Sequence, residues 1–269
     1  MGNGQAWSRT KIVAILVAAA AAALTLVGGA VAAVVLALAP ADEPTTGAQP
    51  GPTPGGQGPG GPGAVGRDAI AAAPMLPVSP ADATGGAPST TLPGTIFVPN
   101  PTEVGPARVA TGFPSTPQGA VGQLGAILVD VVQTMSIPRA HEVHRAWTEP
   151  GAGPAKDWVM TQNVAAFLDG AGLSGQEAGT RARVEAVPAA AQIKGVDGDD
   201  WVVVCVLLDM TASIDRTIDV AYGHCERMTW QQGRWVIAAG DPPAPAPSTW
   251  PGTDLAADAG WLTWQPETP

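Results

Sequence analysis

Basic residues are scarce in this chain. It has 13 Lys and Arg against 23 Asp and Glu, which gives a net charge of −10 over 269 residues. A nucleic-acid-binding surface needs a basic stripe that can pair with phosphates. The composition therefore argues against nucleic acid as a partner, although net charge does not bear on the fold.

Catalytic and cofactor signatures are also missing. The chain has no G-x-S-x-G nucleophile elbow and no phosphate-binding Walker loop. His141 and His144 stand in "HEVH", which is one residue short of the H-E-x-x-H zinc motif, so we interpret them as part of a polar helix face. The third histidine, His224, is expected to face solvent. We predict no catalytic residue, no cofactor and no metal ligand.

The acidic triplet of Asp197, Asp199 and Asp200 in "VDGDD" also lacks a metal-binding pattern. An EF-hand loop needs oxygen ligands at alternating positions and a distant Glu, and neither requirement is met. The triplet therefore predicts an acidic turn between two strands.

One long uncharged run dominates the N-terminal region. No charged residue lies between Lys11 and Asp42. A helix over 12–39 would be roughly 42 Å long, which exceeds the ~30 Å hydrocarbon layer of a bilayer. The basic residues before the run predict a cytoplasmic tip at 1–11 and a single-pass cell-membrane protein whose remainder is extracytoplasmic. A cleaved signal peptide is the alternative, because "ALA" at 37–39 resembles a cleavage site, but the run is long for a signal core.

Residues 40–105 are rich in Pro and Gly, without the strict triplet of collagen. Few side chains here can bury enough area to offset the entropy of ordering, so we predict a disordered linker. One apolar stretch, "TIFVPNP" at 95–101, is either a strand or a docking segment near the following domain.

Three helices are expected at the start of a domain that spans 106–240. Apolar residues recur at helical spacing in 116–136, 138–149 and 155–172. Ser115 or Thr116 can cap the first helix and Pro117 suits its first turn.

Four strands are expected after the helices. The sequence alternates partly in 181–196, is continuously apolar in "WVVVCVLLDMTA", alternates in "IDVAYGHCERMTW" and ends with "GRWVIAA". The Val187-Pro188 pair should mark a break or an edge. Helices followed by a meander indicate an α+β fold, with helices packed on a curved antiparallel four-stranded sheet. A Pro/Trp-rich tail at 241–269 is expected to fold back on the domain, with a partner-binding surface as the alternative.

The chain has only two cysteines, Cys205 and Cys225. A hairpin turn centred near Asp215 would place them opposite one another, since each is ten residues away. In an extracytoplasmic domain this predicts a structural disulfide. The alternative is a pair of buried free thiols, and a redox-active pair is disfavoured because the C-x-x-C spacing is absent.

The stretch "MTWQQGRWVIAAG", together with the helices and the curved sheet, resembles nuclear transport factor two-like (cystatin-like) cone domains. The wider layout of a short tip, one span, a tether and a cone resembles the bitopic assembly subunit of type IV secretion and conjugation systems. "GFPSTPQGAVGQLGAILVD", "WQQGRWVIAAG" and "PAPAPSTWPGT" are also similar to an actinobacterial family of anchored proteins associated with conjugation-type ATPases. These resemblances supply no catalytic residues.

The resemblance implies a membrane-anchored scaffold that packs with other cell-envelope proteins or with copies of itself. The alternative is a ligand-binding or isomerase-like cone protein, which needs an ionisable side chain inside the cone. Asp209 and Tyr222, on the central strands, are the candidate pocket residues. A deep pocket with either side chain pointing inward would favour the alternative, and a filled cone would favour the scaffold. An extracytoplasmic sensor is a third hypothesis, which the short tip disfavours.

Overall fold

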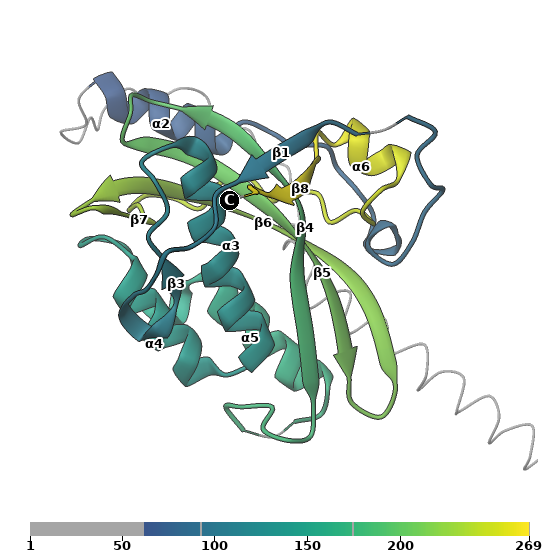
Figure 1. Cartoon of the computed structure of the whole chain (residues 1–269). Coiled ribbons are helices and arrows are strands. Elements are labelled where there is room, and N and C mark those ends of the chain that lie inside the picture. Colours follow the sequence, from purple (N-terminus) through teal and green to yellow (C-terminus); the bar gives the residue numbers. More distant parts are fainter. Residues whose placement is uncertain (1–61, 92, 174, 269) are drawn as a thin grey trace, which may run out of the picture.

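The computed structural model describes residues 62–91, 93–173 and 175–268. Figure 1 shows long, curled strands with three helices gathered on one side of them. The elements follow one another in the order α2 (Pro62–Ala72), η1 (Pro80–Ala83), β1 (Thr95–Val98), β2 (Glu103–Val104), η2 (Pro106–Arg108), β3 (Ala110–Thr111), α3 (Pro117–Thr134), α4 (Ile137–Trp147), η3 (Ala155–Asp157), α5 (Val159–Gly170), β4 (Arg183–Val196), β5 (Trp201–Ser213), β6 (Thr217–Gln231), β7 (Arg234–Ile237), α6 (Asp254–Asp258) and β8 (Leu262–Pro266). The predicted α+β class is confirmed.

Six strands form the main sheet, in the order β1-β8-β4-β5-β6-β7, and β2 pairs separately with β3. The expected antiparallel meander is β4 to β7. The expectation of four strands is wrong because β8 pairs with β4 at Ala190 and Ala191, and β1 runs parallel beside β8. β4 continues through Pro188 with a register shift, and β8 does not pair with it there, so the proline occupies a locally open edge.

Helices α3, α4 and α5 cover one face of the sheet, here called the inner face. The Thr116 hydroxyl accepts a hydrogen bond from the Gly119 amide at 3.0 Å and Pro117 opens α3, as the sequence predicts. Even-numbered residues of β5, from Val202 to Ala212, pack against these helices in the larger core. The alternation of side chains along the strand places its odd-numbered residues on the other, outer face.

The outer face is covered as well. Ala71 of α2, and Ala246, Ala256 and Trp261 after β7, are buried in a second core with Val203 and Leu207 of β5. A β-carbon on Gly223 of β6 would lie 3.0 Å from the Pro247 carbonyl oxygen, so only glycine lets the tail cross this closely. The continuous apolar sequence of β5 is explained by this double cover, and the tail folds back as expected.

The linker expectation is wrong for the described part of 40–105. Ile96 and Val98 of β1 are buried, and α2 docks on the sheet. Of the two alternatives for "TIFVPNP", the structure shows the strand: Thr95–Val98 pairs with β8, which the sequence pattern does not predict. The remaining linker at 40–61, the expected span at 12–39 and the tip at 1–11 lie outside the described residues. Among the described residues, no helix combines the length and apolar character needed to cross a membrane.

Candidate functional site

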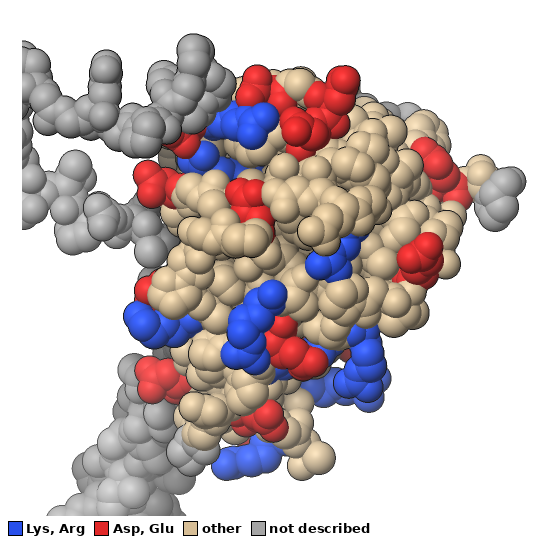
Figure 2. Space-filling view, turned by 90° about the vertical axis from the view of Figure 1, so that its left-hand side faces the viewer, with Lys and Arg blue, Asp and Glu red and all other residues tan. Residues whose placement is uncertain are grey.

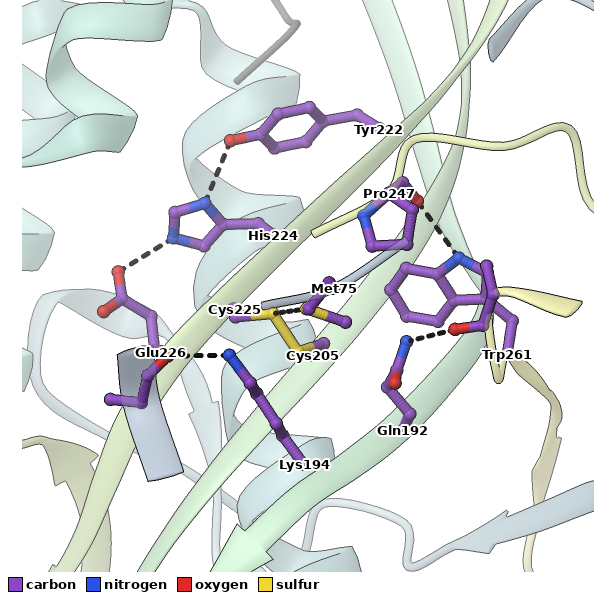
Figure 3. Close-up of a disulfide and its surroundings, with 12 residues drawn as sticks. Met75, Gln192, Lys194, Cys205, Tyr222, His224, Cys225, Glu226, Pro247 and Trp261 are labelled. Atoms are coloured by element: carbon purple, nitrogen blue, oxygen red, sulfur yellow. Dashed lines mark hydrogen bonds and ion pairs between the residues drawn. A yellow bond between two sulfur atoms is a disulfide. The ribbon is translucent and has the colours of Figure 1, made fainter. Parts of the chain in front are cut away.

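Strand β6 carries ionisable side chains on a buried face. Tyr222, His224 and Glu226 are alternate residues, so they point to the same, inner side, where the helices α4 and α5 cover them. Figure 3 shows these three side chains on one side of β6 and the disulfide on the other. Together with Asn163 and Trp158 they form what we call the β6 polar chain.

The β6 polar chain is continuous. Asn163 Nδ2 donates to the Tyr222 hydroxyl at 2.6 Å, and this hydroxyl lies 3.0 Å from His224 Nδ1. His224 Nε2 lies 2.8 Å from Glu226 Oε1, which also accepts a hydrogen bond from Trp158 Nε1 at 2.8 Å. The polar groups of the chain are therefore matched to one another.

Hydrogen-bond donors are assigned at two points of the chain. A carboxylate only accepts hydrogen bonds, so Nε2 of His224 donates to Glu226. The Tyr222 hydroxyl donates to Met160 Sδ of α5 at 3.3 Å and lies 3.0 Å from His224 Nδ1. Loss of solvent by burial raises the pKa of Tyr222 above its ordinary value, which keeps this hydroxyl protonated.

His144 of α4 adjoins the chain. Its ring packs against Trp158 with 5.4 Å between ring centroids, and the residue is buried. Burial lowers the pKa of His144, and the nearby Glu226 opposes that shift. The polar helix face expected for "HEVH" is therefore wrong for His144, because α4 turns this position into the core.

The expectation that His224 faces solvent is also wrong. It assumed one covered face, with Cys225 inside and His224 outside, whereas both faces of β6 are covered. A Y-x-H-x-E alternation in "AYGHCER" was the available sequence signal. Asn163 and Trp158 could not have been found, because they meet β6 only through the packing of α5.

The two candidate pocket residues do not share a pocket. Asp209 is paired with Ala221 and Leu208 with Tyr222, so Asp209 and Tyr222 point to opposite faces. Tyr222 is only 2% exposed and its hydroxyl is occupied by hydrogen-bond partners. Asp209 is half-buried on the outer face, where loss of solvent and the charge of Asp219 raise its pKa.

The cysteine pair forms the predicted disulfide. Cys205 and Cys225 are directly opposite in the β5–β6 register, with 4.0 Å between their α-carbons. Both lie in the outer core, where the sulfur of Met75 is 3.6 Å from Cys225 Sγ. The bond therefore fastens the two central strands beneath the segment that follows α2.

The described residues contain no group of three or more His, Cys, Asp or Glu side chains that could hold a metal ion. The acidic residues of "VDGDD" form the turn between β4 and β5, as expected. Two of them, Asp197 and Asp200, pair with Arg67 of α2 at 2.5 Å and 3.5 Å. Their observed role is to fix α2 on the sheet.

Two cavities lie away from the β6 polar chain. One, of about 650 Å³, is an open polar groove beside Arg139, whose guanidinium makes two 2.8 Å bonds to Asp130. The other, of about 350 Å³, lies on the outer face over Val220 and Ala221, between 72–83 and 244–248. We call the second the proline-lined groove, after Pro74, Pro77, Pro80, Pro245 and Pro247.

The fold and these sites define an α+β protein with a curled sheet covered on both faces and a polar chain sealed inside. Comparison with protein-family models, with curated proteins and with solved structures finds no match.

Proposed function

We propose that the described domain is a non-catalytic binding and assembly module of the cell envelope. The observation that supports this is the sealed β6 polar chain. Tyr222, His224 and Glu226 use one another as partners, and neither cavity is lined by any of them. A general acid or base must reach a reacting atom, and these groups point at each other instead.

We place the module outside the cell membrane, anchored by the run at 12–39. The Cys205–Cys225 disulfide supports this placement, because such bonds persist in oxidising compartments. The layout is that of an assembly subunit of a conjugation or type IV-like secretion machine, whose partners are other envelope proteins or further copies of this chain. Charged side chains of both signs are interspersed on the largely uncharged face in Figure 2, which favours recognition by apolar and backbone groups.

The test is affinity isolation of the full chain from membranes after cross-linking in cells. The proposal predicts that the chain stays in the membrane fraction at full length and is recovered with other envelope proteins or with itself. A shortened chain released from the membrane, or a full-length chain without any adduct, contradicts it.

A second candidate function is the binding of a small apolar ligand in the proline-lined groove. Its volume of about 350 Å³ and its Met, Leu and Pro lining support this alternative, since ligand cavities start at about 300 Å³. Ala221 forms part of its floor, so Ala221→Leu should abolish binding of an apolar fluorescent probe such as anilinonaphthalene sulfonate. Asp209 does not line the groove, so Asp209→Asn is the matched control.

A further inference from the structure

The outer edge of β1 has no partner strand in the described chain. β1 is the first strand of the sheet and pairs only with β8. The carbonyl oxygens of Gly94 and Val98 accept hydrogen bonds from the amides of Thr263 in β8 and of Glu267 just after β8, at 2.8 Å and 2.9 Å. Backbone groups of successive residues point to alternate edges of a strand. The N–H and C=O groups of the odd-numbered residues therefore point away from the sheet.

The opposite edge of the sheet is covered at Ile237. Thr148 forms a bridge with Ile237 of β7, and the Glu149 amide donates to the Ile237 carbonyl at 2.9 Å. The carboxylate of Glu149 accepts a hydrogen bond from the amide of Ala239. In the described part of the chain, β1 thus provides an edge of the six-stranded sheet that no segment covers.

The open edge also lacks a charged residue. Natural edge strands often carry charged residues that discourage pairing. β1 reads Thr-Ile-Phe-Val, without a charge, and the Phe97 side chain is 60% exposed. Prolines stand at 93 and 99, which are the next positions whose backbone would face outward. They remove the N–H groups there and so limit any added ladder to β1 itself.

We propose that β1 pairs with β1 of a second copy of this chain, antiparallel about a two-fold axis through Ile96. This inference rests on the proposed assembly function and names its partner. In that register Thr95 lies opposite Phe97 of the second copy, and Phe97 opposite its Thr95. Each Thr95–Phe97 pair across the two copies forms two N–H···O=C hydrogen bonds, so the two chains share four hydrogen bonds.

A second copy suits this edge for two further reasons. An aromatic residue opposite a β-branched residue is a favourable cross-strand pair, and the register makes that pair twice. A two-fold contact also closes on itself, because both copies use the same edge, so this contact joins two sheets and no more. The contact is far smaller than the roughly 1,000 Å² of a stable interface, so its affinity is low. We therefore expect it to form only where membrane anchoring raises the effective concentration of the two copies.

Cysteine cross-linking of the full chain in membranes tests the register. Both native cysteines are in the disulfide, so one introduced cysteine provides the free thiol. Thr95→Cys and Phe97→Cys chains carrying different tags are co-expressed and oxidised. We expect mixed Thr95→Cys/Phe97→Cys dimers roughly tenfold above the control level, because the proposed register holds these two positions opposite one another. The matched control is Val196→Cys, which is 51% exposed at the far end of β4.

The outcomes separate the two proposals. Mixed dimers that disappear when Phe97→Cys also carries Ile96→Pro support the pairing, since proline distorts the strand at the two-fold axis. Adducts with other proteins alone overturn the second-copy pairing and leave the assembly function standing. Cross-linking no greater than that of Val196→Cys, with no other adducts, overturns both. A cooperative unfolding transition in each variant shows that the domain has folded.

Discussion

The side chains of the β6 polar chain connect different parts of the structure. Glu226 Oε1 accepts from two buried donors, His224 and Trp158, whereas the Tyr222 hydroxyl joins an α5 residue to the strand. A buried donor that loses its partner costs more than the hydrogen bond contributed. These residues should therefore matter for stability even though none faces a cavity.

Removing one hydroxyl tests this directly. We expect Tyr222→Phe to lower the free energy of unfolding by about 1–3 kcal/mol, because Asn163 Nδ2 and His224 Nδ1 lose their partner. Chemical denaturation measures the loss. The double variant Tyr222→Phe with Asn163→Leu should recover part of it, and a single variant as stable as the parent would show that the hydroxyl is not a structural link.

The lowered pKa of His144 predicts a pH dependence. The folded state holds the proton less tightly than the unfolded state, whose pKa is near 6.5. Stability should therefore fall as the pH drops below about 6.5, since the unfolded chain then binds the extra proton. His144→Phe keeps a ring against Trp158 and removes the titration. Unfolding midpoints at pH 7.5 and 5.5 should differ less in this variant, and an unchanged difference would exclude His144 as the cause.

At the scale of elements, two links lie on the outer face of the sheet. One is the disulfide between β5 and β6, which closes a loop with a sequence separation of 20. The other is the docking of α2, in which the buried Arg227 of β6 binds Asp68 at 2.5 Å. The disulfide lowers the conformational entropy of the unfolded chain, and the ion pair positions α2.

Replacing both cysteines by alanine should lower the free energy of unfolding by about 3 kcal/mol on the loop-entropy estimate. The same loss should follow from reducing the parent protein, and a reductant should leave the double variant unchanged. Denaturation with and without reductant makes both comparisons. Equal stability of the parent and the double variant under oxidising conditions would refute a structural role.

Asp68→Ala should loosen α2 by roughly 1–3 kcal/mol, because a buried guanidinium loses its carboxylate. Hydrogen exchange should speed up at the amides of α2 and stay unchanged in α3. Asp258→Ala, on the short helix α6 away from this ion pair, serves as the control. Faster exchange throughout the domain would mean that the pair supports the whole fold.

On the scale of the whole molecule, local patterns predicted one layer of the structure and missed the other. Periodicity and the Thr116 cap predicted α3 to α5, and the strand patterns predicted the β4–β7 meander. They left β1 as one of two alternatives and did not predict β8 or α2, since these short segments are fixed by tertiary neighbours. The candidate site was predicted in part for the same reason. Tyr222 is a candidate pocket residue in the sequence, and it is buried in the structure. Its partner Asn163 depends on the packing of α5, and the opposite direction of Asp209 depends on the strand register.

A truncation tests how the layers depend on one another. A chain ending at Gly260 lacks β8 and the buried Trp261, whose Nε1 donates to Pro247 at 3.0 Å. We expect a loss of at least about 3 kcal/mol from the missing Trp. Amides of β1 should also lose protection from exchange, because β8 connects β1 to the sheet. A chain ending at Glu267 is the control, and a protected β1 in the shorter chain would contradict this dependence.

The strand order has a consequence for biosynthesis. Thr95 of β1 pairs with Thr263 of β8, which the ribosome adds about 170 residues later. At roughly 5–20 residues per second, the "TIFV" segment stays unmatched for about 10–30 s, longer than most local folding takes. Its neighbour β8 is the last strand of the sheet to be made, so the sheet is completed only after β8 has emerged. A nascent chain of this protein has to be kept from premature contacts at β1 until then.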